Sequence, residues 1–127
     1  MPLMPATQSN SSGRPGRLKR RAEFLRAASA GKKAAIGGVV LQALARDDNQ
    51  VRLGFTVTKK VGNAVVRNRT RRRLKEAARL LLQNLVLQER PVAGVDLVLI
   101  GRDSTRKRNF LALQADIRRA LERTGVA

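Results

Sequence analysis

A short segment of the chain carries a dense run of cationic side chains whose chemistry is the binding of anions. Nine basic residues lie between positions 59 and 79, against a single acid, Glu76: Lys59, Lys60, Arg67, Arg69, Arg71, Arg72, Arg73, Lys75 and Arg79. Arginine offers forked donors that match phosphate oxygens, and the amides of Asn63 and Asn68 can bond a phosphate or a ribose hydroxyl. This pattern indicates a surface for a nucleic-acid backbone.

One long helix would position these side chains. If residues 63–85 are helical, the apolar residues fall on one stripe: Val66, Thr70, Leu74, Ala77, Ala78, Leu81 and Leu85. Asn68, Arg72, Lys75 and Arg79 follow the opposite side, and Arg67 drifts toward the apolar side, where it would be partly buried. A merely solvated charged face is disfavoured, because such faces mix signs and this one carries essentially one sign.

The composition supports a polyanionic partner. The 127 residues include 27 basic and 9 acidic side chains, a net charge of +18. There is no cysteine, which suits a reducing cytoplasm. The longest apolar run, residues 95–100, is interrupted by Asp96, so we expect neither a membrane span nor a secretion signal. A membrane surface is disfavoured as partner, since no basic helix carries bulky aromatic anchors.

The residues needed for protein-based hydrolysis are sparse. No histidine is present, and the nine acids are scattered, with only Asp47 and Asp48 adjacent, in what looks like a turn. A two-metal nuclease needs several carboxylates that converge from different elements. We therefore expect that the protein, if it takes part in catalysis, does not supply the catalyst.

The remaining elements follow from periodicity and turn signals. Residues 1–16 are rich in Pro, Ser and Gly and predict a disordered, basic and polar tail, so that one RNA-binding domain spans residues 17–127. Residues 18–30 have helical spacing. Residues 32–45 and 51–58 predict two antiparallel strands around a turn at 47–50, with a bulge or break at Gly37-Gly38.

The chain ends with a strand and a helix. Residues 95–101 form a nearly continuous apolar run, typical of a central strand that is covered on both faces. Residues 109–124 place one apolar face at helical spacing, with Asn109 as a cap. The order α-β-β-α-β-α predicts an α+β (α/β) sandwich, in which helices pack on one small mixed sheet of three or four strands.

The central segment carries a family resemblance. Residues 54–76 read GFTVTKKVGNAVVRNRTRRRLKE, in which a strand, a KK-G-N-A-V segment and an Arg-Asn-Arg signature open the basic helix. This sequence resembles the protein subunit of bacterial ribonuclease P. Residues 18–24 (LKRRAEF) and 96–102 (DLVLIGR) support the resemblance, which covers about residues 17 to 123.

The resemblance implies a function and a handedness. In that family a large catalytic RNA, with magnesium ions (Mg2+), removes the 5′ leader from precursor tRNA. The small protein binds this RNA and the leader, one protein per RNA, and promotes binding of substrate and metal. The resemblance also implies a left-handed β-α-β crossover through the basic helix, whereas general rules predict a right-handed one.

Site residues follow by position in the family pattern. The residues that match the segment contacting the catalytic RNA are Lys59, Lys60, Asn63, Arg67, Asn68, Arg69, Arg71, Arg72 and Lys75. Phe24, with Arg17 and Lys19, matches the cleft where the single-stranded leader passes over the sheet, and stacking would explain an aromatic there. No protein residue is expected to be catalytic or to ligate metal.

The cleft departs from the family pattern. Positions that are often aromatic in relatives are Ala28, Val39 and Gln42 here, so leader binding should rest more on contacts of cations with phosphates. For Phe24, stacking and core packing stay equal alternatives, while Phe55 and Phe110 are expected in the core.

Two other classes of protein remain open at this point. A ribosomal or general RNA-binding protein fits the composition equally well, and only the Arg-Asn-Arg context favours the ribonuclease P reading. A helix-turn-helix DNA-binding protein is disfavoured, because the basic helix follows a strand rather than a short helix and a tight turn.

Overall fold

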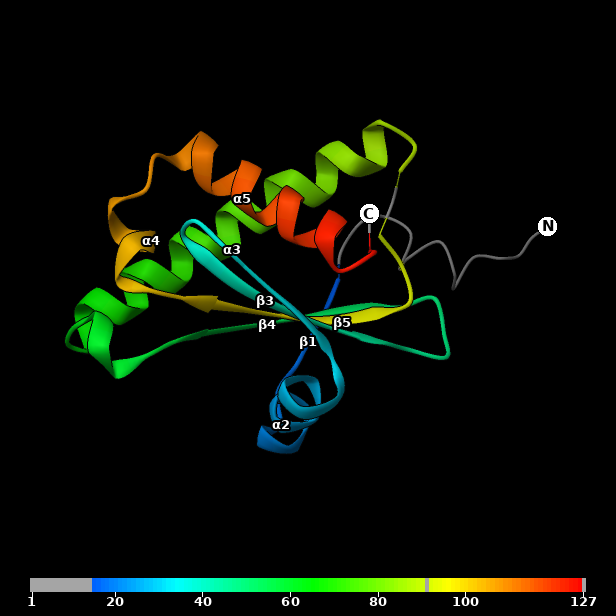
Figure 1. Cartoon of the computed structure of the whole chain (residues 1–127), viewed down its shortest axis with the longest axis horizontal. Coiled ribbons are helices and arrows are strands. Elements are labelled where there is room, and N and C mark those ends of the chain that lie inside the picture. Colours follow the sequence, from blue (N-terminus) through cyan, green and yellow to red (C-terminus); the bar gives the residue numbers. More distant parts are fainter. Residues whose placement is uncertain (1–14, 91, 127) are drawn as a thin grey trace.

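A five-stranded sheet with helices on both faces forms the protein (Figure 1). The computed structural model describes residues 15–90 and 92–126. Its elements are β1 (Gly16–Arg17), α2 (Arg21–Ala30), β2 (Lys32–Ile36), β3 (Val39–Ala45), β4 (Val51–Val57), the 3-10 turn η1 (Lys59–Val61), α3 (Ala64–Leu87), β5 (Val95–Gly101), α4 (Asp103–Lys107) and α5 (Phe110–Arg123). The expected α+β fold with a mixed sheet is confirmed. The predicted tail up to residue 14 lies outside the described residues, and Gly16 pairs with Arg52 in β1.

The strand order is β1-β4-β5-β3-β2. β5 lies parallel to β4 and antiparallel to β3. The expected direct pairing of the two strands around residues 47–50 is therefore wrong, because β5 inserts between them. The physical reason is burial: Val95 to Leu99 are all buried, because β3 and β4 pair with both edges of β5 and helices cover both faces of the sheet there.

The predicted strand 32–45 divides at Gly37-Gly38 into the antiparallel hairpin of β2 and β3. Gly37 has φ +51, and a Cβ there would overlap the Asp116 carboxylate. Asp116, 1% exposed, accepts hydrogen bonds from the Gly38 amide (2.9 Å) and from Arg108 Nε (2.8 Å). Burial acts to raise the pKa of Asp116, but these bonds outweigh it and lower that pKa. The carboxylate thus fastens α5 to the hairpin.

Helix α3 follows its predicted amphipathic pattern. It begins after Asn63, whose Oδ1 accepts a hydrogen bond from the Val66 amide at 3.0 Å. The predicted stripe is buried from Thr70 to Leu85, whereas Val66 is half-buried. Asn109 caps α5 in the same way, as predicted, through the Leu111 amide at 2.9 Å.

Helix α2 starts three residues later than predicted, at Arg21. The Leu18 amide donates to the Leu53 carbonyl at 2.9 Å, so the chain is still extended beside β4 at that point. β1 itself has two residues, too few for the sequence pattern to indicate a strand.

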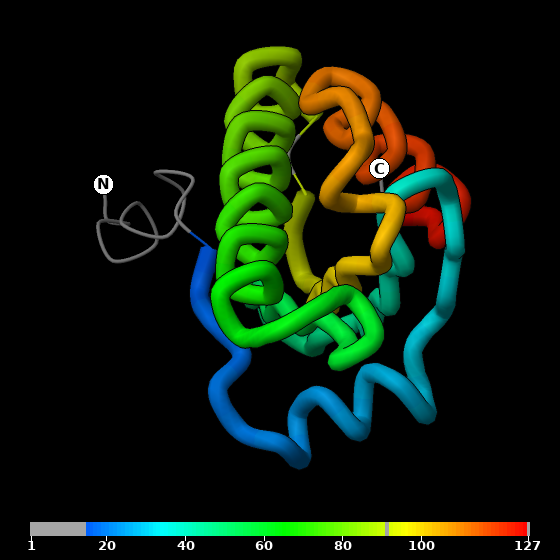
Figure 2. Tube along the Cα trace, turned by 90° about the vertical axis from the view of Figure 1, so that its left-hand side faces the viewer, coloured from blue at the N-terminus to red at the C-terminus, as the bar shows by residue number. Residues whose placement is uncertain are grey.

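The two faces of the sheet carry different helices. α3, α4 and α5 lie over one face and α2 over the other (Figure 1). The main core lies under α3 and α5 and includes Leu41, Leu74, Leu99 and Leu113, and a smaller cluster around Ala27 and Val98 lies under α2. The connection β4-α3-β5 is left-handed, as the two views together show (Figures 1 and 2).

The Gly37 turn can be tested by a pair of substitutions. Gly37→Ala should lower the free energy of unfolding by about 1–3 kcal/mol more than Gly125→Ala. Both glycines have a positive φ, but a Cβ at Gly125 meets nothing within 4 Å, so the difference isolates the overlap with Asp116. Urea unfolding followed by circular dichroism measures it. Equal losses for the two variants would show that Asp116 moves aside at no cost.

Candidate nucleic-acid interface

The predicted contacts to the catalytic RNA lie together on η1 and the first three turns of α3. Their exposed members are Lys59, Lys60, Asn63, Asn68, Arg69, Arg72 and Lys75. We call these residues, with Arg67 and Arg71, the η1–α3 surface. Arg67 is half-buried, as expected, and Arg71 is half-buried as well. The sequence pattern therefore identified one contiguous cationic surface.

Contacts within this surface limit what some side chains can offer. Arg71 Nη1 donates to Asn68 Oδ1 at 2.7 Å, and Asn63 Oδ1 is used as the helix cap. The Arg67 Nε is buried and has no hydrogen-bond partner among the described residues, as its expected drift toward the apolar side had indicated. Arg69, Arg72 and Lys75 have the greatest freedom to meet a phosphate.

Two other arginines of the run are occupied. Arg73 Nη1 donates to the Thr105 carbonyl at 2.7 Å, and its guanidinium lies 5.8 Å from the centre of the Phe110 ring. Arg79 Nη2 forms a 2.6 Å ion pair with Glu76, the single acid of the run. Within residues 59–79, the exposed cations without an acidic partner therefore all precede Glu76.

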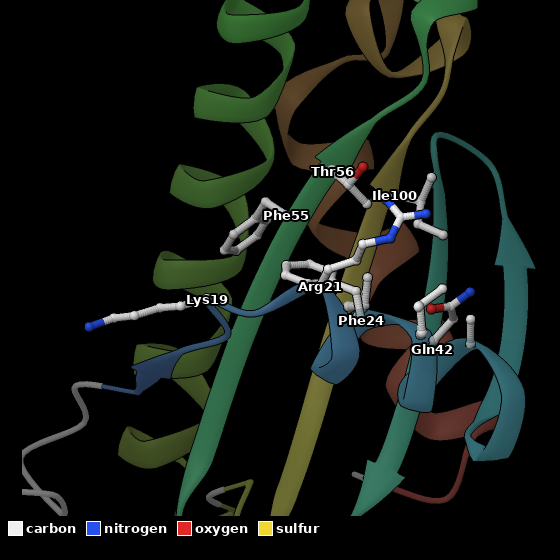
Figure 3. Close-up of a pocket in the computed structure, with 10 residues that line it drawn as sticks. Lys19, Arg21, Phe24, Gln42, Phe55, Thr56 and Ile100 are labelled. Atoms are coloured by element: carbon white, nitrogen blue, oxygen red, sulfur yellow. The ribbon is translucent and has the colours of Figure 1, made fainter.

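A cleft of about 520 Å³ opens on the other face of the sheet, between α2 and the strands (Figure 3). Its lining residues are Lys19, Arg21, Phe24, Leu25, Ala28, Gln42, Phe55, Thr56, Val98 and Ile100. Lys19 and Phe24, two of the three predicted leader contacts, thus line this cleft, with the Lys19 ammonium directed away from Phe24 in Figure 3. Arg17 lies in β1 and does not line the cleft. Sequence reasoning missed Arg21, although the Arg20-Arg21 pair at the start of α2 was a visible signal.

Phe24 packs in the core and also lines the cleft, so its stacking on the leader stays a prediction. It is half-buried and packs against the Val98 cluster while it lines the cleft. Its ring lies directly on the backbone of β4, because a Cβ at Gly54 would come within 2.6 Å of Phe24 Cε1. Only glycine leaves room for this ring.

The other positions of interest around the cleft divide between the two faces. Phe55 packs against the main core, as expected, and also reaches the edge of the cleft. Phe110 packs against the main core as expected. Ala28 and Gln42 line the cleft, but Val39 is fully buried in the main core under α5, so its inclusion with them was wrong.

An ion-pair network underlies the cleft. Asp96, 5% exposed, accepts hydrogen bonds from Arg52 Nε (2.9 Å) and Nη2 (2.8 Å), and from Arg46 Nη1 (3.1 Å). Burial acts to raise the pKa of Asp96, but the two guanidinium groups outweigh it and lower that pKa. Arg52 Nη1 also reaches Glu23 of α2 at 2.6 Å. The network therefore ties α2 to the central strands.

Glu23 also caps α2. Its Oε1 accepts hydrogen bonds from the backbone amides of Arg20 (3.0 Å) and Lys19 (2.9 Å). These bonds, followed by the contact with Arg52, lower the pKa of Glu23 to about 2. One carboxylate thus holds the residues that border the cleft.

Two further findings concern the described residues as a set. Within residues 15–90 and 92–126, no three acidic side chains come together as a metal site. No helix in this part of the chain combines the length and hydrophobicity that crossing a membrane requires.

The fold and the two surfaces define a small basic α+β protein that presents a cationic helix on one face and an open cleft on the other. A family model described as Ribonuclease P matches residues 13–125. The chain therefore belongs to the bacterial ribonuclease P protein family. This membership decides against the ribosomal and DNA-binding alternatives.

Individual relatives agree with the family. The ribonuclease P protein component of Gluconacetobacter diazotrophicus is 63% identical over 114 residues, covering 89% of this chain and 94% of the relative. That of Ruegeria pomeroyi is 47% identical and covers 95% of each chain. Among solved structures, the RNase P protein of Staphylococcus aureus matches with a TM-score of 0.69 at 26% identity, covering 89% of this chain and 98% of that one. The Thermotoga maritima protein matches with a TM-score of 0.66 at 25% identity, covering 84% and 96%.

The Glu23 network should be visible in the pH dependence of stability. Since the folded-state pKa of Glu23 lies below its ordinary value of 4.5, its contribution is present above pH 4.5 and is lost as the pH falls toward 2. Glu23→Gln should therefore be less stable than the wild type at pH 6, and the gap should narrow between pH 5 and pH 3. Urea midpoints across this range measure the gap.

Asp47→Asn is the matched control. It removes the same charge from an exposed turn residue that forms no ion pair among the described residues, so its gap to the wild type should not narrow in this way. A pH-independent gap for Glu23→Gln would show that the carboxylate acts by packing alone.

Proposed function

We propose that this protein binds the catalytic RNA of ribonuclease P through the η1–α3 surface and the 5′ leader of precursor tRNA through the α2 cleft. One protein would act with one RNA, in the cytoplasm. The RNA would carry out the cleavage with magnesium ions that it holds mainly itself, and the protein would strengthen binding of substrate and metal.

The observation that carries this proposal is the segregation of free cations. Arg69, Arg72 and Lys75 are exposed on a helix whose buried stripe packs on the sheet, and no acid precedes Glu76 on that helix. A rigid row of unpaired cations fits the regular spacing of phosphates on a folded RNA, and release of counterions drives such binding. Because the chain belongs to the ribonuclease P family, we take the bound RNA to be the catalytic RNA of ribonuclease P.

The cleft supports a different kind of RNA contact. Its lining is largely apolar, with Phe24, Val98 and Ile100, and Lys19 and Arg21 bring positive charge to its edge. An aromatic ring beside cations suits an unpaired strand, whose bases stack while its phosphates meet the cations. Because the cleft and α3 lie on opposite faces of the sheet, the two RNA segments would not compete.

The hydrogen bonds and ion pairs of the buried or partly buried acidic residues support the proposal that the RNA, rather than the protein, carries out the cleavage. Asp96, Asp116 and Glu23 are engaged by arginine guanidinium groups and backbone amides. Carboxylates held in this way stabilise the fold and are not free to act as bases or metal ligands. The chain also has no histidine.

Reconstitution tests the proposal. The isolated protein should leave precursor tRNA intact, whereas addition of a bacterial ribonuclease P RNA should give accurate 5′ processing at a magnesium concentration where the RNA alone is slow. Gel analysis of end-labelled precursor measures both. Robust cleavage by RNA-free protein, or no stimulation of the RNA, contradicts the proposed division of labour.

The role of Phe24 in leader binding can be tested with a substitution that does not leave a cavity over Gly54. Phe24→Leu keeps an apolar side chain over Gly54 but removes the stacking face, and it should weaken binding of long-leader precursor by about 1 kcal/mol, the low end for a stacked base. Affinity for mature tRNA should not change. Fluorescence titration of the assembled enzyme measures both. Ala28→Leu, on the same helix, is the control for a change of volume in the cleft. Unchanged leader affinity in Phe24→Leu would leave Phe24 as a packing residue only.

A further inference from the structure

A second basic element lies beside the η1–α3 surface. Helix α4 follows β5 and contacts α3 on the sheet face opposite α2 (Figure 1). It carries Arg106 and Lys107, both exposed, and neither belongs to the segment that matches the family signature. Its acid, Asp103, lies 3.5 Å from Arg106 at the exposed side of the helix.

The position of α4 is fixed by Thr105, which is fully buried. The Thr105 hydroxyl donates to the Gly38 carbonyl and accepts from the Arg102 amide at 2.8 Å. The Thr105 carbonyl in turn accepts from Arg73 Nη1 of α3 at 2.7 Å. The short helix is therefore held against both α3 and the hairpin turn, and its cations stand at set positions.

Between the two helices lies a cleft of about 340 Å³. Its lining residues are Val66, Arg69, Thr70, Arg73, Arg106 and Lys107, four cations and no acid. Arg73 is already oriented by Thr105 and by the ring of Phe110. Like charges gathered in one concave site repel one another, and a bound anion relieves this repulsion.

We propose that the cleft between α3 and α4 binds a backbone phosphate of the catalytic RNA, so that Arg106 and Lys107 extend the RNA interface beyond the η1–α3 surface. This inference rests on the proposed function. The cleft shares Arg69 with the η1–α3 surface, so one RNA backbone that follows α3 would enter it. The leader is disfavoured as occupant, because its cleft lies on the other face of the sheet.

The test compares two double variants in titrations with ribonuclease P RNA at several salt concentrations. Arg106→Ala with Lys107→Ala should weaken binding by about tenfold or more and reduce the salt slope by roughly 1.5, as expected for two lost charged contacts to phosphate. Leader-dependent affinity for precursor tRNA in the assembled enzyme should not change. An effect on leader affinity alone would overturn the assignment to the catalytic RNA.

The matched control removes two cations at the other end of the same face, with Lys32→Ala and Arg123→Ala. Lys32 opens β2, at the opposite end from the Gly37 turn that contacts α4, and Arg123 ends α5. If this control weakens binding as much as the α4 variant, the effect is one of net charge and the cleft is not a site. If the wild-type protein does not bind the RNA at all, the proposed function fails. If the wild type binds and the α4 variant binds equally well, only the proposed phosphate site between α3 and α4 is overturned.

A measurement on the unaltered chain makes the result independent of variant folding. Bound catalytic RNA should protect the Lys107 amine from acylation, read by mass spectrometry, while Lys32 stays reactive. Equal labelling of Lys107 with and without RNA would overturn the inference.

Discussion

The central placement of β5 is the constraint on which the rest of the structure depends. Val95 to Leu99 are buried, so the strand needs neighbours on both edges and a layer on both faces. Since β5 lies parallel to β4, the chain between them must cross the sheet, and α3 is that crossing. The helix packs its stripe from Thr70 to Leu85 on the sheet and turns its cations outward. The same strand leaves its second face to α2, where the cleft forms.

The one charged residue of β5 shows how a chain of net charge +18 can fold. Asp96 is buried, and a buried carboxylate without partners would cost several kcal/mol, of order 3–5 when one member of a pair is lost. Arg46 and Arg52 hold it from both neighbouring strands. Seven of the nine acids form ion pairs with arginine: Glu23, Asp48, Glu76, Asp96, Asp103, Asp116 and Glu122. These acids thus determine which cations are structural, whereas Lys59, Lys60, Arg69, Arg72 and Lys75 on η1 and α3, and Lys107 on α4, have no acidic partner among the described residues. Their mutual repulsion disfavours the free protein and favours the bound one.

The sequence pattern predicted those features of the fold that depend on residues close together in the chain. The stripe of α3, the Asn63 and Asn109 caps and the buried strand 95–101 all depend on residues within a few positions of one another. The insertion of β5 between β3 and β4 depends on contacts far apart in the chain, and adjacency in sequence favoured the wrong pairing. The contacts of Arg73 could not be predicted for the same reason, because its partners Thr105 and Phe110 lie more than 30 residues away in the sequence. β1 and α4, with two and five residues, are too short to show a period.

The α2 cleft shows how the scaffold positions a single aromatic residue. Gly54 lets the Phe24 ring rest on the backbone of β4, where the ring packs against the Val98 cluster. Arg52, two residues earlier on β4, holds Glu23, one residue before Phe24 on α2. The position of the ring is therefore determined twice, by contact with the strand and by the ion pair beside it. A ring that is held in place loses little entropy when a base stacks on it, which would favour binding of the proposed leader by a single aromatic residue.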